Sequence, residues 1–311
     1  MRCVLVSNRM DLRKFLGLEL ARIEDRVEVV DHRPSGTDTE VRMALAWHPP
    51  ADAFEAYPNL QVVGSTGAGV DSILTCPSLR TGVDVVRVVD PAQAKMMAGF
   101  VVWHVINHQR RFATFQAQQR EEVWRTLPQR AASSVPVGLL GFGAMGHAVA
   151  TSLLSLGFPV MAWSRTAKPA FASVRTFHGS DGLTAMLRET EVLVNLLPLT
   201  AETVGILDRR VFGAMRRGGY LIQVGRGEHT VEDDLLAALD NGQLSGAALD
   251  VFNTEPLPKA HPFWHHPNVV VTPHDACDAS PRAVADMLLS IADALQAGAR
   301  PANTVDRARG Y

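Results

Sequence analysis

Short apolar runs alternate with polar or turn-forming segments along the first hundred positions. The runs that read as strands lie at 3–6, 27–30, 43–47, 60–64 and 85–89. A helix-like stretch at 11–22 separates the first two of them. Parallel strands need a crossover connection, usually a helix, so this alternation predicts a parallel α/β sheet.

A second alternation begins at Val135, after a segment of different character. Residues 92–125 lack strong helix breakers and carry five aromatic side chains, which predicts one or two helices, and 128–134 reads as a connector. Further strands are expected at 137–140, 159–163, 191–196, 220–224, 247–251 and 268–272. Helices are expected at 144–156, 231–239 and 281–297, the last with apolar residues at helical spacing.

The composition is that of an ordinary globular protein, with 47% hydrophobic and 20% charged residues in 311. A formal net charge of −2 gives no electrostatic reason to expect nucleic acid or an anionic membrane as a partner. Cys3, Cys76 and Cys277 lie far apart, so we expect neither a metal site nor a disulfide framework. The sequence shows no signal peptide or membrane span, and the expected location is the cytoplasm.

A glycine-rich loop follows the expected strand at 137–140 and opens the next helix. Its sequence is Gly141-Phe142-Gly143-Ala144-Met145-Gly146, a G-x-G-x-x-G. Gly141 permits the tight turn, Gly143 lets the backbone approach a pyrophosphate, and Gly146 allows the helix to pack closely on the strand. The alternative is a strand–helix turn without a ligand. The strand–loop–helix context predicts a dinucleotide site that includes Ala144 and Met145.

The next strand bears on which nicotinamide cofactor is bound. It ends Ser164-Arg165-Thr166-Ala167-Lys168, with none of the acidic residues that often bind the 2′-hydroxyl of NAD. Arg165 and Lys168 suit a 2′-phosphate, and Ser164 and Thr166 can donate hydroxyl hydrogen bonds. The alternative is a solvated basic loop. NADP(H) is therefore the preferred cofactor, with NAD(H) possible.

Many ordered segments resemble the D-isomer-specific 2-hydroxyacid dehydrogenase family, and its glyoxylate/hydroxypyruvate reductase A branch in particular. The segments that carry the resemblance include Gly67–Ser72, the nucleotide loop, 163–166, 195–198, 200–203, 226–227, 231–236, 249–252, 255–258, 272–274 and the closing 305–311. The resemblance implies an NAD(P)-dependent enzyme that moves a hydride between the cofactor and a small 2-oxo or 2-hydroxy acid. Independently of the resemblance, the segment 92–125 is expected to link two lobes, and its aromatic side chains suggest a homodimer surface.

The family's catalytic residues fall on Arg226, Glu255 and His274. By this resemblance Arg226 binds the substrate carboxylate, His274 donates or accepts the proton, and Glu255 orients the imidazole. Each has a plain alternative: a surface arginine, a loop carboxylate and one of 11 histidines.

Other site residues are assigned around these three. Asp250 is expected to bind the nicotinamide carboxamide or, alternatively, to cap a turn. The remaining cofactor residues expected are Leu197, Pro198, Thr203, Val224 and Gly225. The remaining substrate residues expected are Trp47, Ala68 and Gly69. Backbone amides at 67–69 would form a small anion-binding concavity, the alternative being a plain strand–helix turn. The alternative for Trp47 is a core tryptophan.

Three places in the sequence depart from the family pattern, and two other functions are alternatives to the one that the resemblance implies. Asp275 follows His274 where an apolar residue is usual, Gln223 replaces an Asn, and Lys95-Met96-Met97 lies in a region expected at the cleft. These differences leave open a preference for bulkier apolar 2-oxo acids. A formate dehydrogenase would pair its histidine with Gln rather than Glu255, and a non-catalytic dinucleotide-sensing protein would not need a proton donor.

The expected architecture is two α/β lobes, Rossmann-like and flavodoxin-like, with parallel sheets and an active-site cleft between them. The substrate lobe is expected to span 1–100 plus 283–311. The dinucleotide-binding lobe is expected to span 101–282.

Overall fold

The computed structural model describes residues 1–33 and 36–310, and it divides the chain into two compact units. Unit 1 comprises Met1–Gln93 and Asp278–Tyr311, and unit 2 comprises Ala94–Cys277. Both boundaries lie several residues before the positions expected from sequence. Met97 and Ala98 already pack in the core of unit 2, and Ala279 already packs in the core of unit 1. Tyr311, the last residue of the closing family-like segment, lies outside the described residues.

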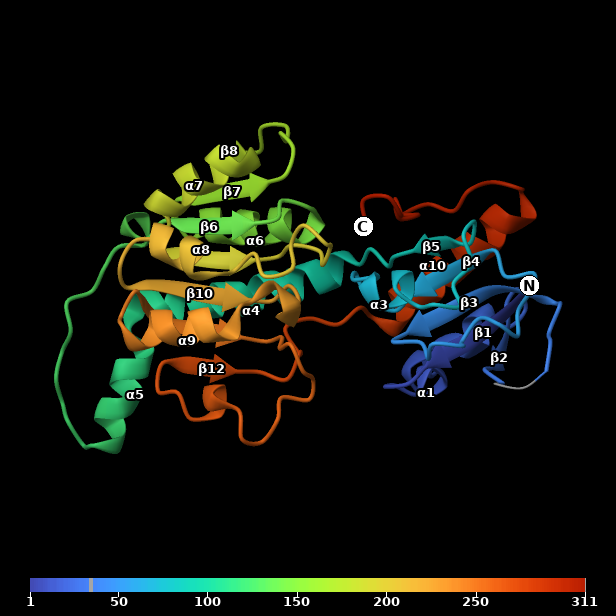
Figure 1. The fold of residues 1–311 in the computed structure, drawn as a ribbon, viewed down its shortest axis with the longest axis horizontal. Helices are drawn as coiled ribbons and strands as arrows, with labels where there is room; N and C mark the ends of the chain where they lie inside the picture. Colours follow the sequence, from blue (N-terminus) through green and yellow to red (C-terminus); the bar gives the residue numbers. More distant parts are fainter. Residues whose placement is uncertain (34–35, 311) are drawn as a thin grey trace. The chain divides into compact units, whose positions relative to one another are not determined.

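Unit 1 is built on a five-stranded parallel sheet in the order β2-β1-β3-β4-β5 (Figure 1). Its strands are β1 (Arg2–Ser7), β2 (Glu28–Asp31), β3 (Val41–Trp47), β4 (Val62–Ser65) and β5 (Asp84–Val86). This is the flavodoxin-like strand order. The expected sheet is confirmed for unit 1.

The helices that accompany this sheet in the described part of unit 1 are α1 (Leu12–Leu16), α2 (Glu19–Ile23), α3 (Asp71–Leu74) and α10 (Pro281–Gln296). The single helix expected at 11–22 is in fact α1 and α2, because Gly17 takes a φ of 52° and ends the first. Alternate residues of β1 point into two cores, with Leu5 on the α10 face and Val4 on the other. The sheet is thus buried on both faces, as parallel sheets usually are.

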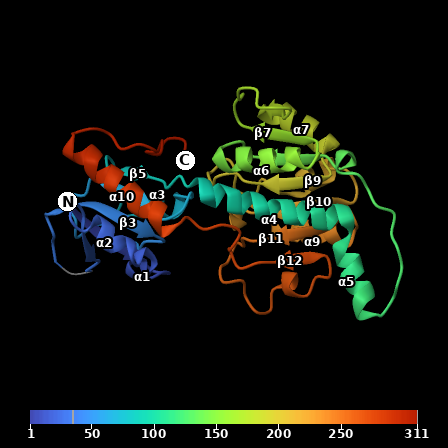
Figure 2. The same cartoon turned by 180° about the vertical axis from the view of Figure 1, so that it is seen from behind.

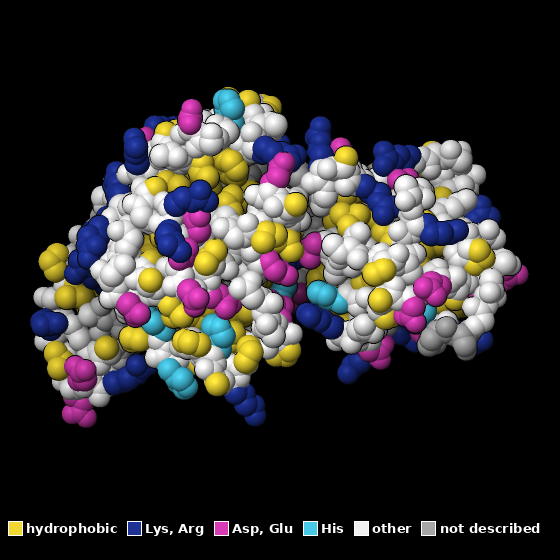
Figure 3. Space-filling model, in the orientation of Figure 1, with side chains coloured by type: hydrophobic (Ala, Val, Ile, Leu, Met, Phe, Trp, Pro, Cys, Tyr) yellow, Lys and Arg dark blue, Asp and Glu magenta, His cyan; other side chains and the backbone are white. Residues whose placement is uncertain are grey.

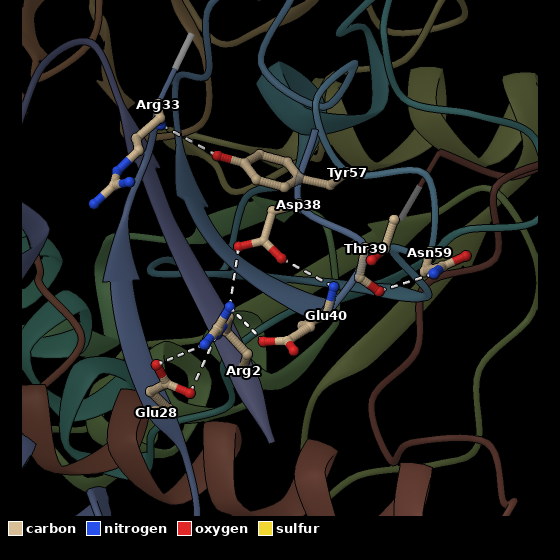
Figure 4. Close-up of polar contacts among 8 residues, drawn as sticks. All are labelled: Arg2, Glu28, Arg33, Asp38, Thr39, Glu40, Tyr57 and Asn59. Carbon is tan, nitrogen blue, oxygen red and sulfur yellow. Dashed lines mark hydrogen bonds and ion pairs between the residues drawn. The ribbon is translucent and has the colours of Figure 1, made fainter. Parts of the chain in front are cut away.

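The amino ends of the unit 1 strands are tied together by one arginine. Arg2 forms ion pairs with Glu28, Asp38 and Glu40, at N···O distances of 3.0, 3.3 and 2.6 Å (Figure 4). These charged side chains lie at the amino ends of the strands, whereas Trp47 lies at the carboxyl end of β3. The carboxyl ends of the strands are therefore the ones that present the candidate substrate residues.

Unit 2 is built on a seven-stranded parallel sheet in the order β12-β11-β10-β9-β6-β7-β8. Its strands are β6 (Val137–Leu140), β7 (Val160–Ser164), β8 (Arg175–His178), β9 (Val192–Asn195), β10 (Gly219–Gln223), β11 (Leu244–Leu249) and β12 (Val269–Val271). Strand order reverses between β6 and β9. In open α/β sheets, ligands bind beyond the carboxyl ends of the strands at such a switch point.

Helices cover both faces of the unit 2 sheet (Figure 2). They are α4 (Pro91–Arg110), which begins in unit 1, α6 (Ala144–Ser155), α7 (Gly179–Glu189), α8 (Arg209–Ala214) and α9 (Glu232–Asp240). A further helix, α5 (Phe112–Arg120), follows α4. Three short 3-10 turns lie at Ala132–Ser134, Gly227–His229 and Pro262–Trp264. No helix among the described residues is long and apolar enough to cross a membrane.

The segment 111–131 forms a projection that we call the arm. The predicted helical segment divides into α4 and α5 at Arg111, which takes a left-handed φ of 58°. In both views α5 and the irregular chain after it extend away from the sheet of unit 2 (Figures 1 and 2). The arm has little core of its own, since Gln118 is the one buried residue of α5.

Candidate active site

The three predicted catalytic residues follow three neighbouring strands of unit 2. Arg226 comes after β10, Glu255 after β11, and His274 after β12. Those strands are adjacent and parallel, so all three residues lie at the same edge of one sheet. This edge is also the one that carries the glycine-rich loop after β6.

Glu255 and His274 form a hydrogen-bonded pair. The Nδ1 atom of His274 lies 2.9 Å from Oε2 of Glu255, and both side chains are partly buried. The other carboxylate oxygen, Oε1, accepts the backbone N–H of Phe252 at 3.1 Å, which orients the carboxylate. Nδ1–H therefore donates to Glu255, and Nε2, which has no hydrogen-bond partner among the described residues, is the nitrogen available to a ligand.

Asp250 holds the turn that presents His274. Its carboxylate accepts the hydroxyl of Thr272 at 2.6 Å and the backbone N–H groups of Asp275 and Ala276 at 2.9 and 3.0 Å. His274, between them, takes a left-handed φ of 57°. Because Asp250 is only 1% exposed, its main contacts are within the chain, as in the turn-capping alternative. A contact with the nicotinamide stays a prediction.

Arg226 lies between two glycines that allow its loop to approach its neighbours. A Cβ on Gly227 would lie 1.9 Å from the carbonyl carbon of Phe252, so this position packs directly on the backbone before Glu255. A Cβ on Gly225 would lie 2.8 Å from Nδ2 of Asn195. Any other residue at 227 would push the arginine loop away from the loop that carries Glu255.

A buried cluster of polar side chains under Arg226 was not found from the sequence. It consists of Asn195, Gln223, His229 and Thr230, all buried, at the carboxyl ends of β9 and β10 and in the turn after Arg226. Gln223, the family departure, donates to the Arg226 carbonyl and accepts from the Gly225 amide, at 2.9 and 3.2 Å. One signal was available: Asn195 and Gln223 are polar residues at the ends of otherwise apolar runs.

The glycine-rich loop has the geometry that a pyrophosphate needs. Gly141 takes a φ of 98°, and a Cβ there would meet the carbonyl oxygen of Leu196 at 2.9 Å. A Cβ on Gly146 would lie 2.5 Å from the carbonyl oxygen of Gly141, while Gly143 has open space beside it. Gly143 is the N-cap of α6 and no side chain caps that helix, so its first N–H groups can bind an anion. The residues present fit a dinucleotide.

The segment after β7 is more involved in internal contacts than its sequence indicates. The guanidinium of Arg165 is ion-paired with Glu202 at 2.6 Å, and the Ser164 hydroxyl donates to the carbonyl of Thr166 at 2.9 Å. Thr166 and Lys168 are exposed. A 2′-phosphate on Arg165 would have to share the guanidinium with Glu202 or displace it.

Leu197, Pro198 and Thr203 lie after β9, across the switch point from the glycine-rich loop. We call residues 196–203 the wall segment. The Thr203 hydroxyl bonds to the Thr200 amide and the Pro198 carbonyl, both at 2.8 Å, which closes the segment into a turn. Val224 and Gly225 are buried at the end of β10. Their contacts with a cofactor stay predictions.

Trp47 and the 67–69 loop come together in unit 1, after β3 and β4. A Cβ on Gly67 would lie 3.0 Å from Cζ3 of Trp47, so the indole packs on this glycine. The Gly67 amide is taken by the hydroxyl of Ser65, which itself donates to the Gly69 carbonyl. Any anion concavity here therefore rests on the amides of Ala68 and Gly69, and its role stays a prediction.

The other two departures can be placed as well. Asp275 has an exposed side chain. Met97 is only 6% exposed within the core of unit 2, so the expectation that both methionines line a cleft is wrong for Met97, whereas Met96 is 51% exposed. Among the described residues no group of three or more His, Cys, Asp or Glu side chains is placed to hold a metal ion.

Comparison with known proteins gives a consistent result. The family described as "D-isomer specific 2-hydroxyacid dehydrogenase, NAD binding domain" matches residues 102–276, which lie within unit 2. Glyoxylate/hydroxypyruvate reductase A of Serratia proteamaculans (strain 568) is 42% identical over 281 residues, covering 89% of this chain and 90% of that protein.

Solved structures agree over the full length. A D-isomer specific 2-hydroxyacid dehydrogenase of Xanthobacter autotrophicus Py2, in complex with NADPH and MES, has a TM-score of 0.94 and 38% identity, covering 100% of this chain and 99% of that one. An NADPH-dependent glyoxylate/hydroxypyruvate reductase of Sinorhizobium meliloti, in complex with NADP and sulfate, has a TM-score of 0.93 and 35% identity, with the same coverage. The chain therefore belongs to the D-isomer specific 2-hydroxyacid dehydrogenase family.

Proposed function

We propose that this protein is an NADP(H)-preferring reductase that converts small 2-oxo acids of the glyoxylate and hydroxypyruvate type into 2-hydroxy acids. The observation that carries the proposal is the Glu255–His274 hydrogen bond, at the strand edge that also holds Arg226 and the glycine-rich loop. Similarity to reductases of this type at 42% identity supports it.

The chemistry follows from the groups at that edge. Bound NADPH supplies the hydride. Arg226 binds the substrate carboxylate with paired N–H donors and so orients the adjacent ketone. Negative charge grows on the ketone oxygen as the hydride arrives at carbon, and His274 donates a proton to it from Nε2. The product is a 2-hydroxy acid, and the imidazole regains its proton from solvent.

Glu255 makes this proton transfer productive. Its carboxylate accepts the Nδ1–H of His274 and so fixes the ring with Nε2 available to the substrate. The Asp250 contacts hold the backbone of the same turn. In the reverse direction the neutral ring accepts the proton.

The preference for NADP(H) rests on Arg165 and Lys168 at the end of β7. Both are exposed there, and no acidic residue takes the position that would bind a 2′-hydroxyl. Structural relatives crystallised with NADPH or NADP support this preference. NAD(H) remains a usable second cofactor, since the pyrophosphate loop does not distinguish the two.

We also propose a homodimer formed through the arm, and a cytoplasmic location. Trp124 is 99% exposed, Val123 45% and Phe112 42%, an apolar surface that a second copy of the chain would cover. Figure 3 shows hydrophobic side chains at the surface along the arm. Cys3 and Cys76 are free thiols, which fits a reducing compartment.

The test is a substrate panel with the purified protein. NADPH and NADH oxidation is followed with glyoxylate, hydroxypyruvate and bulkier apolar 2-oxo acids, and formate oxidation is assayed with NADP⁺ and NAD⁺. We expect turnover with the two small acids, at a higher kcat/KM with NADPH.

Each other outcome identifies a different function. Faster turnover of bulky acids would replace the substrate class, and formate oxidation would replace the reaction. Tight NADPH binding without turnover of any acid would favour a dinucleotide-sensing protein.

A further inference from the structure

His229 is a fully buried histidine with a complete set of contacts that the mechanism above does not use. It lies in the 3-10 turn after Arg226 and is 0% exposed. Its Nδ1 atom is 3.1 Å from the backbone nitrogen of Arg226 and 2.8 Å from Nδ2 of Asn195. Its Nε2 atom is 3.2 Å from the carbonyl oxygen of Pro198, in the wall segment.

These partners leave one protonation state for the ring. A backbone N–H and an amide NH₂ both point at Nδ1, so Nδ1 must be an acceptor and carries no proton. A carbonyl oxygen faces Nε2, so Nε2 must carry the proton and donate it. The imidazole is therefore neutral, with a single tautomer.

The orientation of the Asn195 amide is fixed by its other contacts. Its oxygen accepts the Leu197 amide at 3.2 Å, and its nitrogen also donates to Gln223 at 2.8 Å. Gln223 in turn donates to the Thr230 hydroxyl and to the Arg226 carbonyl, both at 2.9 Å. The NH₂ group facing His229 is thus required by the whole cluster, which confirms the tautomer.

We propose that His229 is a positioning residue with two separable faces. The Nδ1 face holds the backbone of Arg226, which binds the substrate carboxylate. The Nε2 face holds the carbonyl of Pro198, in the wall segment, which contains the expected cofactor residues Leu197, Pro198 and Thr203. The rigid imidazole ring thereby fixes the distance between Arg226 and the wall segment.

This inference rests on the proposed function, because it assigns the two faces to the 2-oxo acid and to NADPH. Positioning matters because a displacement of about 1 Å at a binding group costs on the order of 10²-fold in rate. A buried N–H group that has lost its acceptor raises the free energy of the folded state, and the loop that carries it is expected to shift until the group finds a new partner.

Two substitutions separate the faces. In His229→Asn, Oδ1 occupies the place of Nδ1 and keeps the acceptor for Arg226, but the donor to Pro198 is lost. In His229→Gln, the terminal amide keeps a donor at the place of Nε2, but the acceptor for Arg226 is lost. KM for glyoxylate, kcat, the dissociation constant of NADPH by fluorescence, and Tm are measured for both.

We expect opposite effects in the two variants. His229→Gln should raise KM for glyoxylate about 10-fold or more, with the NADPH dissociation constant changed less than about threefold. His229→Asn should leave KM for glyoxylate within about threefold and weaken NADPH binding by about threefold to 10-fold. A matched control, His104→Gln, removes another buried histidine of unit 2 and should change Tm alone.

Equal changes in both constants in the two variants, or changes in Tm alone, would overturn the proposal and leave His229 a purely structural residue. An absence of glyoxylate turnover in the wild type would instead overturn the proposed function. The two failures are therefore distinguishable.

Discussion

Arg165 illustrates how one contact can set cofactor preference. Its guanidinium is paired with Glu202, and both side chains are substantially exposed. Exposed ion pairs contribute little to stability, so a phosphate can compete for the arginine. Under the proposed role of Arg165, Glu202 competes with the 2′-phosphate for the guanidinium.

We predict that Glu202→Gln lowers KM for NADPH by roughly twofold to fivefold, the range set by an exposed ion pair. KM for NADH should not change, because NADH has no 2′-phosphate. Steady-state kinetics with each cofactor measure this. Glu189→Gln removes the carboxylate of a similar exposed pair, with Arg175, and serves as the control. An unchanged KM for NADPH in Glu202→Gln would contradict the assignment of Arg165 to the 2′-phosphate site.

His104 gives a pH-dependent contribution to stability. It is 2% exposed on α4, its Nδ1 has no hydrogen-bond partner among the described residues, and burial lowers its pKa from 6.5 to about 4. The unfolded chain therefore binds a proton more readily than the folded one. Stability is lost as pH falls from about 6.5 to about 4, and the loss from this group is complete below that range.

We predict that His104→Leu flattens the pH dependence of the unfolding free energy between pH 6.5 and 4. The wild type should lose on the order of 3 kcal/mol more than the variant over that window. Urea unfolding at a series of pH values measures the difference. Substitution of the exposed His178 is the control, and parallel curves for wild type and His104→Leu would contradict the prediction.

The strand order of unit 2 explains why the three predicted catalytic residues lie at one edge of the sheet although they are far apart in sequence. Adjacent parallel strands bring 226, 255 and 274 to one edge, and close backbone packing at Gly227 sets the separation of two of the loops. A methyl group at this position has no space without movement of the Phe252 backbone.

We predict that Gly227→Ala lowers kcat/KM for glyoxylate by at least about 10²-fold, because it separates the Arg226 and Glu255 loops. Gly213→Ala, in α8, is the matched control, since a Cβ there meets nothing within 4 Å. NADPH affinity and Tm, measured alongside activity, show whether the fold survives. Near-native kcat/KM in Gly227→Ala would mean that this packing does not position the site.

The sequence predicts elements well where burial imposes a pattern. The strands around Leu139 and Val194 lie in continuous apolar runs, and both were expected close to their observed bounds. β8, with the sequence RTFH, is an edge strand with mostly exposed side chains, so no apolar run marked it, and α7 and α8 were also missed. Helices α1 and α2 read as one because a single glycine weakly predicts a break.

The same holds for the site: residues that a local motif requires were predicted, and residues that act only through tertiary contacts were not. Gly141 and Gly146 were predicted because a turn and a close packing require glycine. The cluster of Asn195 and His229 has no periodicity or motif, since its members act on one another through loops that only the fold brings together. The role of Asp250 in holding the His274 turn depends likewise on contacts across two strands.

The arm is a feature of the complete chain rather than of either sheet. α5 and the irregular segment after it expose Trp124 almost completely, and α5 buries only Gln118. The exposed apolar side chains of such a segment are expected to be buried against a second copy of the chain.

We predict that Trp124→Arg converts a dimer into a monomer at micromolar concentration, because a buried unpaired charge would oppose the interface. Sedimentation analysis measures the mass. Leu18→Arg, which places the same charge on a 94% exposed leucine of unit 1, is the control and should stay dimeric. A wild-type monomer, or a dimeric Trp124→Arg, would exclude the arm as the interface.

The most direct test of the account is the kcat of His274→Ala for NADPH-dependent glyoxylate reduction at saturating substrates, with His265→Ala, an exposed histidine of the same unit, as control. We predict a kcat lowered by about 10² to 10⁴-fold, with the NADPH dissociation constant nearly unchanged, because the imidazole acts on the ketone oxygen rather than on the cofactor. A kcat within a few fold of the wild type would contradict the assignment of proton transfer to His274.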